Sequence, residues 1–318
     1  MEQRRSSWLR SSTFVTSGEA KESRIEPLGG PASCTQSGGV EEAVSSYMSN
    51  PQAQNMGTYL YGVTYSQPFV RDKRAFQARG IAGRPIRVVQ QGDLAAIVSD
   101  SPSDQYDITH ENVTAHEGVI EEAMQRADVL PVSFGTVANS DQEVQERLLQ
   151  HESEELHQQL GRIQNRVELG VKALWEQNAL FTEIATEDSA IQALRDQIVG
   201  TTPEETYDLR LQLGELTDAA IQHRREKDST DILDALSPLA VDVRTNNIIT
   251  DMMIVNASFL VDKNQTQAFA DKVSALQQAY AGRITFQFVG PLPPYNFVMV
   301  AVHWEEPTLE EPSDALTQ

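Results

Sequence analysis

The chain has 318 residues, of which 40% are hydrophobic, and its 46 acidic and 25 basic residues give a formal net charge of −21. A chain of this size can bury a sizeable core, and its length favours two domains. The negative charge excludes nucleic acid and anionic membranes as expected partners and favours a protein partner. The sequence contains no run of 18 apolar residues, so we expect no membrane span.

Residues 1 to 55 are rich in Ser, Gly and Pro and show no sustained periodicity, so we expect them to be disordered. Arg4, Arg5 and Arg10 lie among serines as in a targeting peptide, but the apolar core of a secretory signal is missing. The single cysteine, Cys34, lies in this segment. The rest of the chain therefore lacks a thiol for a disulfide, a thiolate metal ligand or covalent catalysis, and a reducing cytosol is the simplest compartment.

The segment from Gly57 to Val137 predicts a strand, a loop, a hairpin, a helix and a closing strand. Residues 86–90 and 93–98 flank Gln91-Gly92, where glycine supplies the positive φ that a tight hairpin needs. We expect these two runs to pair as antiparallel neighbours.

A helix is expected over residues 109–127, with His116 on its apolar stripe. A lone imidazole in that position is interpreted as a hydrogen-bonded core residue rather than as a ligand or a base. The strand over 129–134 follows, and Pro131 favours an edge or a strand end for it.

Ser140 and Glu143 form a capping-box pattern that starts a helix through Ile163. We interpret this helix as a connector between two domains. Residues 166–175 then alternate between apolar and polar, which predicts a strand with one buried face.

The rest of the chain predicts helices, a hairpin and further strands. The expected elements are a helix over 186–199, a helix started by Thr202, Pro203 and Glu205, a hairpin of strands over 241–249 and 252–261 that turns at Thr250-Asp251, a helix capped by Asn264 and ended by Gly282, and strands over 284–288 and 297–302. The order strand, helix, hairpin, helix, strand is that of a ferredoxin-like unit. The second domain follows it with an extra helix and an extra strand, and the first domain is a looser version.

The expected fold class is therefore α+β with two domains. The boundaries are a disordered extension over 1–55, an N-terminal domain over 56–139, a connector helix over 140–165, a modified ferredoxin-like C-terminal domain over 166–304 and an acidic disordered tail over 305–318.

Sequence motifs of common catalytic sites are missing, including phosphate-binding loops, dinucleotide-binding motifs and zinc-protease motifs. His151 and Glu155 share one face of the connector helix, but His157 lies on the opposite side, so the three cannot close around one metal ion. Ser133 has no His or carboxylate at a useful spacing for a nucleophile. We predict no enzymatic activity, no metal and no cofactor, and we interpret the glutamates at 152, 154 and 155 as solvent-facing charge.

Four segments resemble, in order and spacing, the gas vesicle protein F/L family. They are Tyr59 to Val63, Val129 to Val137, the E-x-G-V-K strand from Glu168 to Lys172, and Gly290 to Val298. The resemblance runs from about Met56 to about Trp304. It implies two linked α+β domains, the second a modified ferredoxin-like unit.

The resemblance also implies a function. The implied role is that of a non-enzymatic accessory protein of gas vesicles in the cytoplasm, a minor shell component or an assembly or nucleation factor. Its implied partners are the hydrophobic main shell subunit and other gas vesicle accessory proteins. The alternative from another class is a ferredoxin-like small-molecule sensor, or an enzyme with dispersed site residues, which a concave pocket with convergent polar groups would favour.

The segment from Gly290 to Phe297 has two compatible interpretations. Its prolines fix φ and make a rigid turn between two strands. Tyr295 and Phe297, carried by a segment of low entropy, are also candidates to dock an apolar partner. The candidate partner-binding residues are Pro293, Pro294, Tyr295 and Phe297.

Overall fold

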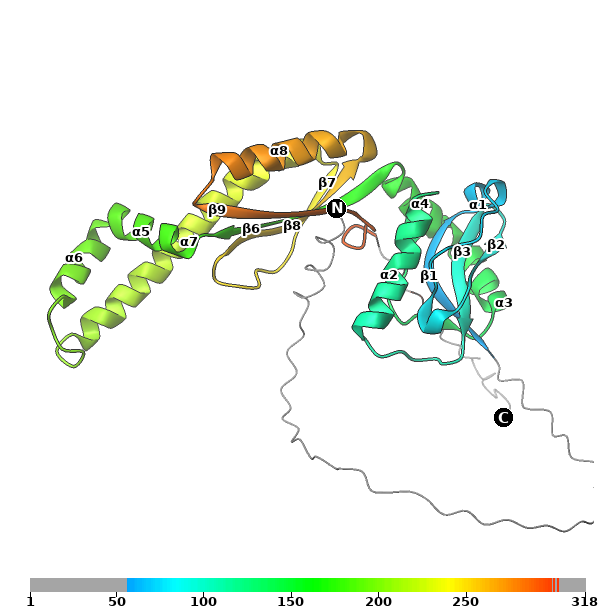
Figure 1. Ribbon diagram of the computed structural model, residues 1–318, viewed down its shortest axis with the longest axis horizontal. Coiled ribbons are helices and arrows are strands. Elements are labelled where there is room, and N and C mark those ends of the chain that lie inside the picture. Colours follow the sequence, from blue (N-terminus) through cyan, green and yellow to red (C-terminus); the bar gives the residue numbers. More distant parts are fainter. Residues whose placement is uncertain (1–55, 299, 301, 303–318) are drawn as a thin grey trace, which may run out of the picture. The chain divides into compact units, whose positions relative to one another are not determined.

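The fold is taken from a computed structural model, which describes residues 56–298, 300 and 302. The expected disordered extension with Cys34 and the expected acidic tail over 305–318 lie outside the described residues. The described part forms a mixed α and β structure with two antiparallel sheets (Figure 1). The expected α+β fold class is confirmed.

The first sheet has the strand order β2-β3-β1-β4, and β5 pairs with β1. Its strands are β1 (Gly57–Tyr65), β2 (Ile86–Gln91), β3 (Leu94–Ser101), β4 (Val129–Pro131) and β5 (Val137–Ala138). The first four strands follow the ferredoxin-like order. Between β1 and β2 the usual helix is reduced to the five-residue α1 (Gln67–Arg71) and the 3₁₀ turn η2 (Ile81–Gly83).

The predicted hairpin is present as β2 and β3. Gln91 pairs with Leu94, so the two connecting residues are Gly92 and Asp93, one position later than expected. Gly92 has the positive φ that the turn requires, at 59°. The expected pairing of the two runs is therefore correct, and the turn position is corrected by one residue.

Helices cover both faces of the first sheet. Residues of a strand point to opposite sides of the sheet, so each strand can supply apolar side chains to both faces. Tyr59 and Tyr61 pack with α2 (His110–Met124), whereas Leu60 and Val63 pack with the segment expected to be a connector. That segment consists of α3 (Asp141–Glu143), the π-helical turn η3 (Val144–Gln150) and α4 (Ser153–Ile163). The single expected helix is thus divided, and its apolar residues complete the core of the first sheet.

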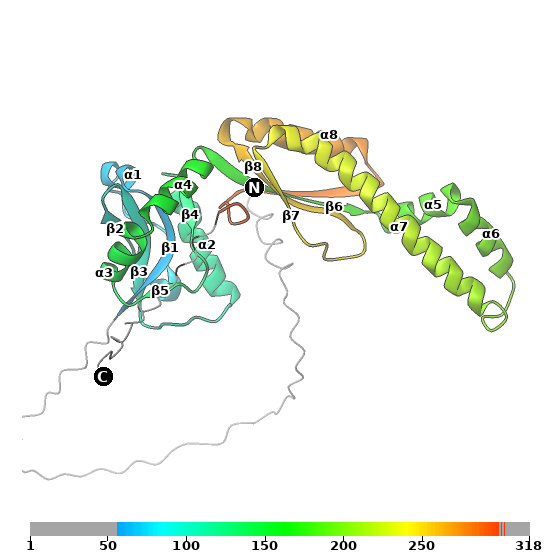
Figure 2. The same cartoon turned by 180° about the vertical axis from the view of Figure 1, so that it is seen from behind.

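The second sheet has the order β7-β8-β6-β9, the full ferredoxin-like order. Its strands are β6 (Arg166–Trp175), β7 (Asp242–Thr245), β8 (Met253–Asp262) and β9 (Ile284–Leu292). The helices are α5 (Gln177–Glu187), α6 (Ser189–Ile198), α7 (Tyr207–Leu236) and α8 (Thr266–Ala279), with 3₁₀ turns η4 (Ser237–Leu239) and η5 (Lys263–Gln265). Figure 2 shows α7 and α8 side by side, and their apolar residues share one core with β6, β8 and β9.

Three elements of this half differ from expectation. The hairpin strand expected over 241–249 ends at Thr245; one further backbone bond joins the Asn246 N–H to the Asn256 carbonyl at 2.7 Å, and the chain to residue 252 is then a loop. Thr202 and Glu205 do form a reciprocal cap, at 3.2 and 3.4 Å, but the helix it was expected to start begins at Tyr207 and continues for 30 residues. The helix expected over 186–199 is present as α6, from Ser189 to Ile198, whereas α5 was not predicted.

The end of the described chain returns to the first sheet. Val298 and Val300 belong to the apolar core of that sheet, and Val300 forms a parallel bridge with Val132. The strand expected over 297–302 had been placed with the second domain. The exact domain boundaries stay a prediction.

An ionic network around the buried Asp228 lies where β6, α5, α7 and β9 meet. Asp228 of α7 is 2% exposed and accepts from the indole N–H of Trp175 at 2.8 Å and from Arg283 at 2.5 Å. Arg283 also donates to Glu183 of α5 at 2.9 Å, and Arg224 binds the same glutamate. A buried charge is tolerated only when it is paired in this way.

Asp228→Ala is expected to lower the free energy of unfolding by about 1–3 kcal/mol, because the buried indole N–H of Trp175 would lose its acceptor and Arg283 would keep only Glu183 as a partner. Chemical denaturation measures the loss. Asp231→Ala, on an exposed position of the same helix, is the matched control and is expected to change stability little. Equal effects of the two substitutions would show that the network contributes nothing to stability.

His116 is 2% exposed and lies among aromatic rings of the first core. The hydroxyl of Tyr59 accepts from the Gly135 N–H at 2.9 Å, so it donates its own proton to Nδ1 of His116, at 3.0 Å. In a neutral imidazole this arrangement places the proton on Nε2, which is buried without a hydrogen-bond partner among the described residues. The interpretation of His116 as a hydrogen-bonded core residue agrees with this geometry.

Burial lowers the pKa of His116 to about 4, although the nearby Val132 carbonyl opposes the shift. The unfolded chain takes up this proton below its ordinary pKa near 6.5, whereas the folded chain does not. The contribution of His116 to stability is therefore complete above pH 6.5 and falls by about 3 kcal/mol as the pH drops toward 4. Urea denaturation across this range should show the loss in the wild type and in His151→Gln, an exposed control, but not in His116→Asn. The same slope in His116→Asn would contradict the assignment.

Candidate partner-binding site

The segment from Gly290 to Phe297 begins as the last part of β9. Its pairing with β6 shifts register between Glu168 and Gly170, and Gly290 lies at this irregularity with φ of 140°. A Cβ at Gly290 would lie 2.6 Å from Cδ2 of Leu169. The glycine therefore permits both the backbone conformation and the close approach to β6.

Glu168 binds the other end of this segment. Its carboxylate is 3% exposed and accepts from the backbone N–H of Asn296 at 3.0 Å and from its side-chain amide at 2.6 Å. Burial raises the pKa of Glu168, and the bonds from Asn296 partly offset that rise. Two of the four sequence segments singled out above, Glu168 to Lys172 and Gly290 to Val298, are thus joined by direct hydrogen bonds.

The four candidate residues lie largely inside the chain. Pro293 and Pro294 are buried, and Phe297 is 6% exposed. Tyr295 is half-buried against the aromatic cluster that contains Tyr59. This burial supports the rigid-turn interpretation, and docking of a partner by these side chains stays a prediction.

An open hollow of about 900 Å³ lies beside the segment. Phe297 and Val298 line one part of it, and Glu152, Glu154 and Glu155 of the α4 region line another. The apolar part of the lining of this hollow is therefore smaller than the acidic part. The three glutamates face solvent, as expected.

The histidines of the same region do not converge. His151 contacts the adjacent Glu152 at 2.9 Å, whereas Nε2 of His157 contacts Asp93 in the β2–β3 turn at 2.9 Å. The contact with Asp93 raises the pKa of His157. Within the described part of the chain, no group of three or more His, Cys, Asp or Glu residues is placed to hold a metal ion.

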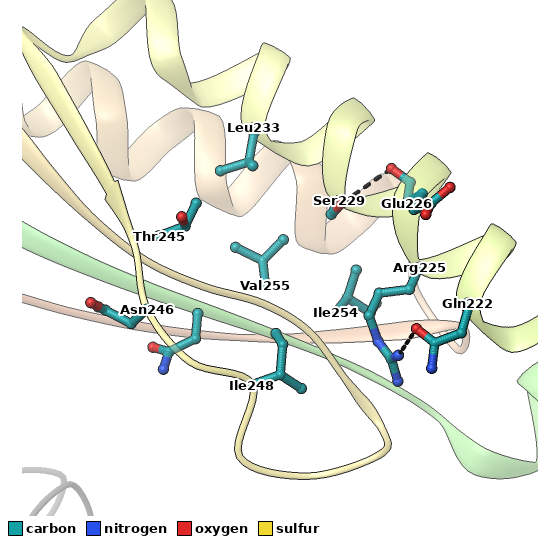
Figure 3. Close-up of a pocket in the computed structure, with 11 residues that line it drawn as sticks. Gln222, Arg225, Glu226, Ser229, Leu233, Thr245, Asn246, Ile248, Ile254 and Val255 are labelled. Carbon is teal, nitrogen blue, oxygen red and sulfur yellow. Dashed lines mark hydrogen bonds between the residues drawn. The ribbon is translucent and has the colours of Figure 1, made fainter.

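A second hollow, of about 270 Å³, lies between α7 and the loop over 246–252 (Figure 3). Leu233, Ile248, Ile254 and Val255 supply its apolar surface. Arg225 lies at one end, and its guanidinium donates to Gln222 at 2.6 Å and to the carbonyls of residues 251 and 253 at 2.7 and 3.1 Å. The hydrogen bonds of the Arg225 guanidinium thus hold the loop against α7.

Sequence reasoning missed this hollow, because residues 241–249 were expected to continue as a strand. It also missed the apolar side chains that the fold leaves exposed. The largest of them are Val70, Ile108, Phe181, Val199, Tyr207, Leu211, Val241, Ile248, Ile249 and Phe288. Their exposure depends on which faces the tertiary structure covers, for which the local pattern carries no signal.

Gly290→Ala is expected to destabilise the chain by about 1–3 kcal/mol, because the new Cβ overlaps Leu169 and the backbone is strained for an L-residue. Thermal unfolding measures the change. Gly282→Ala is the matched control, since Gly282 also has positive φ, at 79°, but has open space around its Cβ position. A loss at Gly290 no larger than that at Gly282 would mean that the close approach to β6 is unimportant.

Comparison with known proteins gives a consistent result. The family model described as gas vesicle synthesis protein GvpL/GvpF matches residues 57–299. Gas vesicle protein F of Streptomyces sp. (strain CB03234) is 33% identical over 244 residues, which cover 76% of this chain and 100% of that protein. Gas vesicle protein F1 of Halobacterium salinarum is 27% identical over 252 residues, which cover 78% of this chain and 95% of that protein.

Solved structures show the same fold. The crystal structure of the gas vesicle protein GvpF from Anabaena sp. PCC7120 aligns with a TM-score of 0.68 at 24% identity, covering 78% of this chain and 100% of that one. The chain belongs to the gas vesicle protein F/L family, as the resemblance of its four segments indicated.

Proposed function

We propose that this protein is a non-enzymatic accessory protein of gas vesicles, either a minor shell component or an assembly or nucleation factor. It binds the hydrophobic main shell subunit and acts in the cytoplasm together with other gas vesicle accessory proteins. The observation that carries the proposal is the relationship to gas vesicle protein F, which extends over the whole of that relative. A shared architecture over that length supports a shared role.

The surface of the described residues supports a protein partner. Exposed apolar side chains occur on α7, on the loop over 246–252 and on β9. Burying apolar area contributes roughly 25 cal/mol per Å², whereas an exposed ion pair contributes about 0–1 kcal/mol. We therefore expect apolar contacts to dominate binding of a hydrophobic subunit. No helix of the described part is long and apolar enough to cross a membrane.

The alternative function, a small-molecule sensor or an enzyme with dispersed residues, requires a concave site with convergent polar groups. The hollow beside α7 is small, and the guanidinium of Arg225 in it is already bonded to three groups of the chain. No observation on the described residues favours this alternative.

The docking role of Tyr295 and Phe297 remains part of the proposal. Tyr295 is half-buried and packs against the aromatic cluster of the first sheet, so its truncation also removes core contacts. Phe297 is buried, and its truncation is expected to destabilise the chain as well as to alter the rim of the adjacent hollow. Binding by variants at these positions must therefore be compared with their stability.

The main shell subunit is expected to bind the purified full-length chain about as tightly in 1 M salt as in low salt. Salt at 1 M screens interactions between charges beyond about 3 Å, whereas buried apolar contacts do not depend on charge. Tyr295→Ala is expected to weaken binding by about 1–3 kcal/mol. Reversal of the charges at Glu152, Glu154 and Glu155 is the control and should leave binding unchanged. Titration at low and high salt measures these effects, with thermal unfolding of each variant.

Fractionation of intact vesicles separates the two proposed roles. Detection of the chain in washed vesicles supports a shell component, and its presence only in assembling fractions supports an assembly factor. Absence of any binding to the shell subunit, in either salt, would reject the proposed partner. Binding that is lost with salt and with the acidic reversals would reject an apolar interface.

A further inference from the structure

Strand β9 is an edge of the second sheet that differs from the other edges. The opposite edge, β7, has four residues, two of which are Asp242 and Arg244. In the first sheet the side chain of Gln145 donates to the Gln90 carbonyl of the edge strand β2, at 2.9 Å, and Val300 bridges to the end of β4. Among the described strands β9, with nine residues, is the longest one at the edge of a sheet (Figure 1).

The sequence of this edge lacks the usual protection. Natural edge strands carry charged side chains, prolines or bulges that block pairing with other chains. From residue 284 to residue 289, β9 contains neither a charged residue nor a proline. The bulge at Gly290 and the proline after it protect only the end of the strand.

The pairing register shows which backbone groups face outward. The Arg283 carbonyl accepts from the Glu176 N–H at 2.8 Å, so this pair bonds toward β6. In an antiparallel ladder such pairs alternate, and Thr285 and Gln287 accordingly bond to β6 as well. The N–H and C=O groups of Phe286 and Phe288 then point away from the sheet. The N–H of residue 284 is already bonded, to the carbonyl of residue 280 at 2.9 Å.

The side chains define the pattern of a strand that fits beside β9. Phe286 is buried on the face covered by helices, and Phe288, 38% exposed, stacks on Phe269 of α8 with ring centroids 6.0 Å apart. Thr285 and Gln287 are exposed on the other face. An added strand would therefore place apolar side chains beside Phe288 and polar side chains beside Gln287.

Charge decides between a second copy and a different protein. Two copies of this chain would bring together two formal charges of −21, and net charge of this size opposes self-association. The edge carries no positive charge that would offset this repulsion. A strand from a protein that does not share this negative charge meets no such opposition.

We propose that residues 284–288 of β9 accept, by strand addition, an extended segment of a partner protein that alternates apolar and polar residues and carries no acidic residue. This inference rests on the proposed function, because it takes the main shell subunit as the partner that supplies the added strand. Backbone hydrogen bonds hold the added strand, and the apolar contact with Phe288 selects its orientation.

Amide hydrogen exchange of the full-length wild-type chain, with and without main shell subunit, tests the pairing directly. In the free chain the amides of Thr285 and Gln287 are protected, whereas those of Phe286 and Phe288 exchange fast. On binding, exchange at Phe286 and Phe288 is expected to slow by about tenfold or more, with little change at Thr285 and Gln287. This measurement needs no variant.

Matched lysine variants test the edge independently. Phe288→Lys introduces a charge where the added strand would pack, and is expected to weaken binding by about tenfold or more. Gln287→Lys adds the same charge on the polar face of the same strand, and Val241→Lys adds it beside the opposite edge. Both controls should bind as the wild type does, and thermal unfolding shows whether each variant is folded.

The outcomes separate this inference from the proposed function. If the wild type binds shell subunit but exchange at Phe286 and Phe288 is unchanged and Phe288→Lys binds normally, the β9 inference is wrong and the proposed function stands. If the wild type does not bind shell subunit, both are wrong. Sedimentation adds a further check: self-association of the wild type that Phe288→Lys abolishes would make a second copy the occupant and overturn the stated partner.

Discussion

The buried carboxylate of Asp228 is the constraint on which the second half of the structure depends. A charge that has left water must be met by donors in the right places, or the chain does not fold around it. Asp228 receives one donor from the end of β6, through Trp175, and one from Arg283 immediately before β9. The last residue of β6 and the residue before β9 are thereby both held against α7.

This arrangement also sets where the helices lie. Arg283 and Arg224 bind Glu183, so that α5 is fixed to α7 at the same point. Beyond it, α5, α6 and the first half of α7 pack mainly on one another and extend past the sheet (Figure 1). A long insertion between β6 and β7 is compatible with a ferredoxin-like unit. Strand pairing fixes the order of the strands, and a longer connection between two strands adds little to the entropy cost.

The two sheets use the same strand order with different coverings. In the first, helical segments pack on both faces, which leaves its strands buried on both sides. In the second, helices share a core with one face, and the other face carries polar side chains such as Asn256 and Gln287. The second sheet consequently offers an amphipathic edge at β9. The buried candidate residues Pro293, Pro294 and Phe297 follow this open edge directly in the chain, so one region supplies both a rigid turn and an accessible strand.

Local patterns in the sequence were sufficient for much of the fold. The alternation in residues 166–175, the apolar stripe that carries His116 and the glycine of the β2–β3 turn each depend on neighbours a few residues away, so their outcome follows from backbone geometry. The resemblance of four short segments was sufficient for the family. The lack of familiar catalytic motifs led us to expect no active site.

Only the tertiary structure decided which surfaces were covered. The end of the segment from 290 to 297 is fixed because Glu168, more than 120 residues earlier, accepts from both the backbone and the side-chain amide of Asn296. Val300 joins the first sheet, and the loop over 246–252 leaves the ladder because Arg225 holds it to α7. Contacts between residues far apart in the chain produce no periodic pattern in the sequence. The position of β9 at the edge of its sheet produces none either. Exposure and edge position are properties of the assembled sheet, which is why the candidate residues could be named from the sequence but their burial could not.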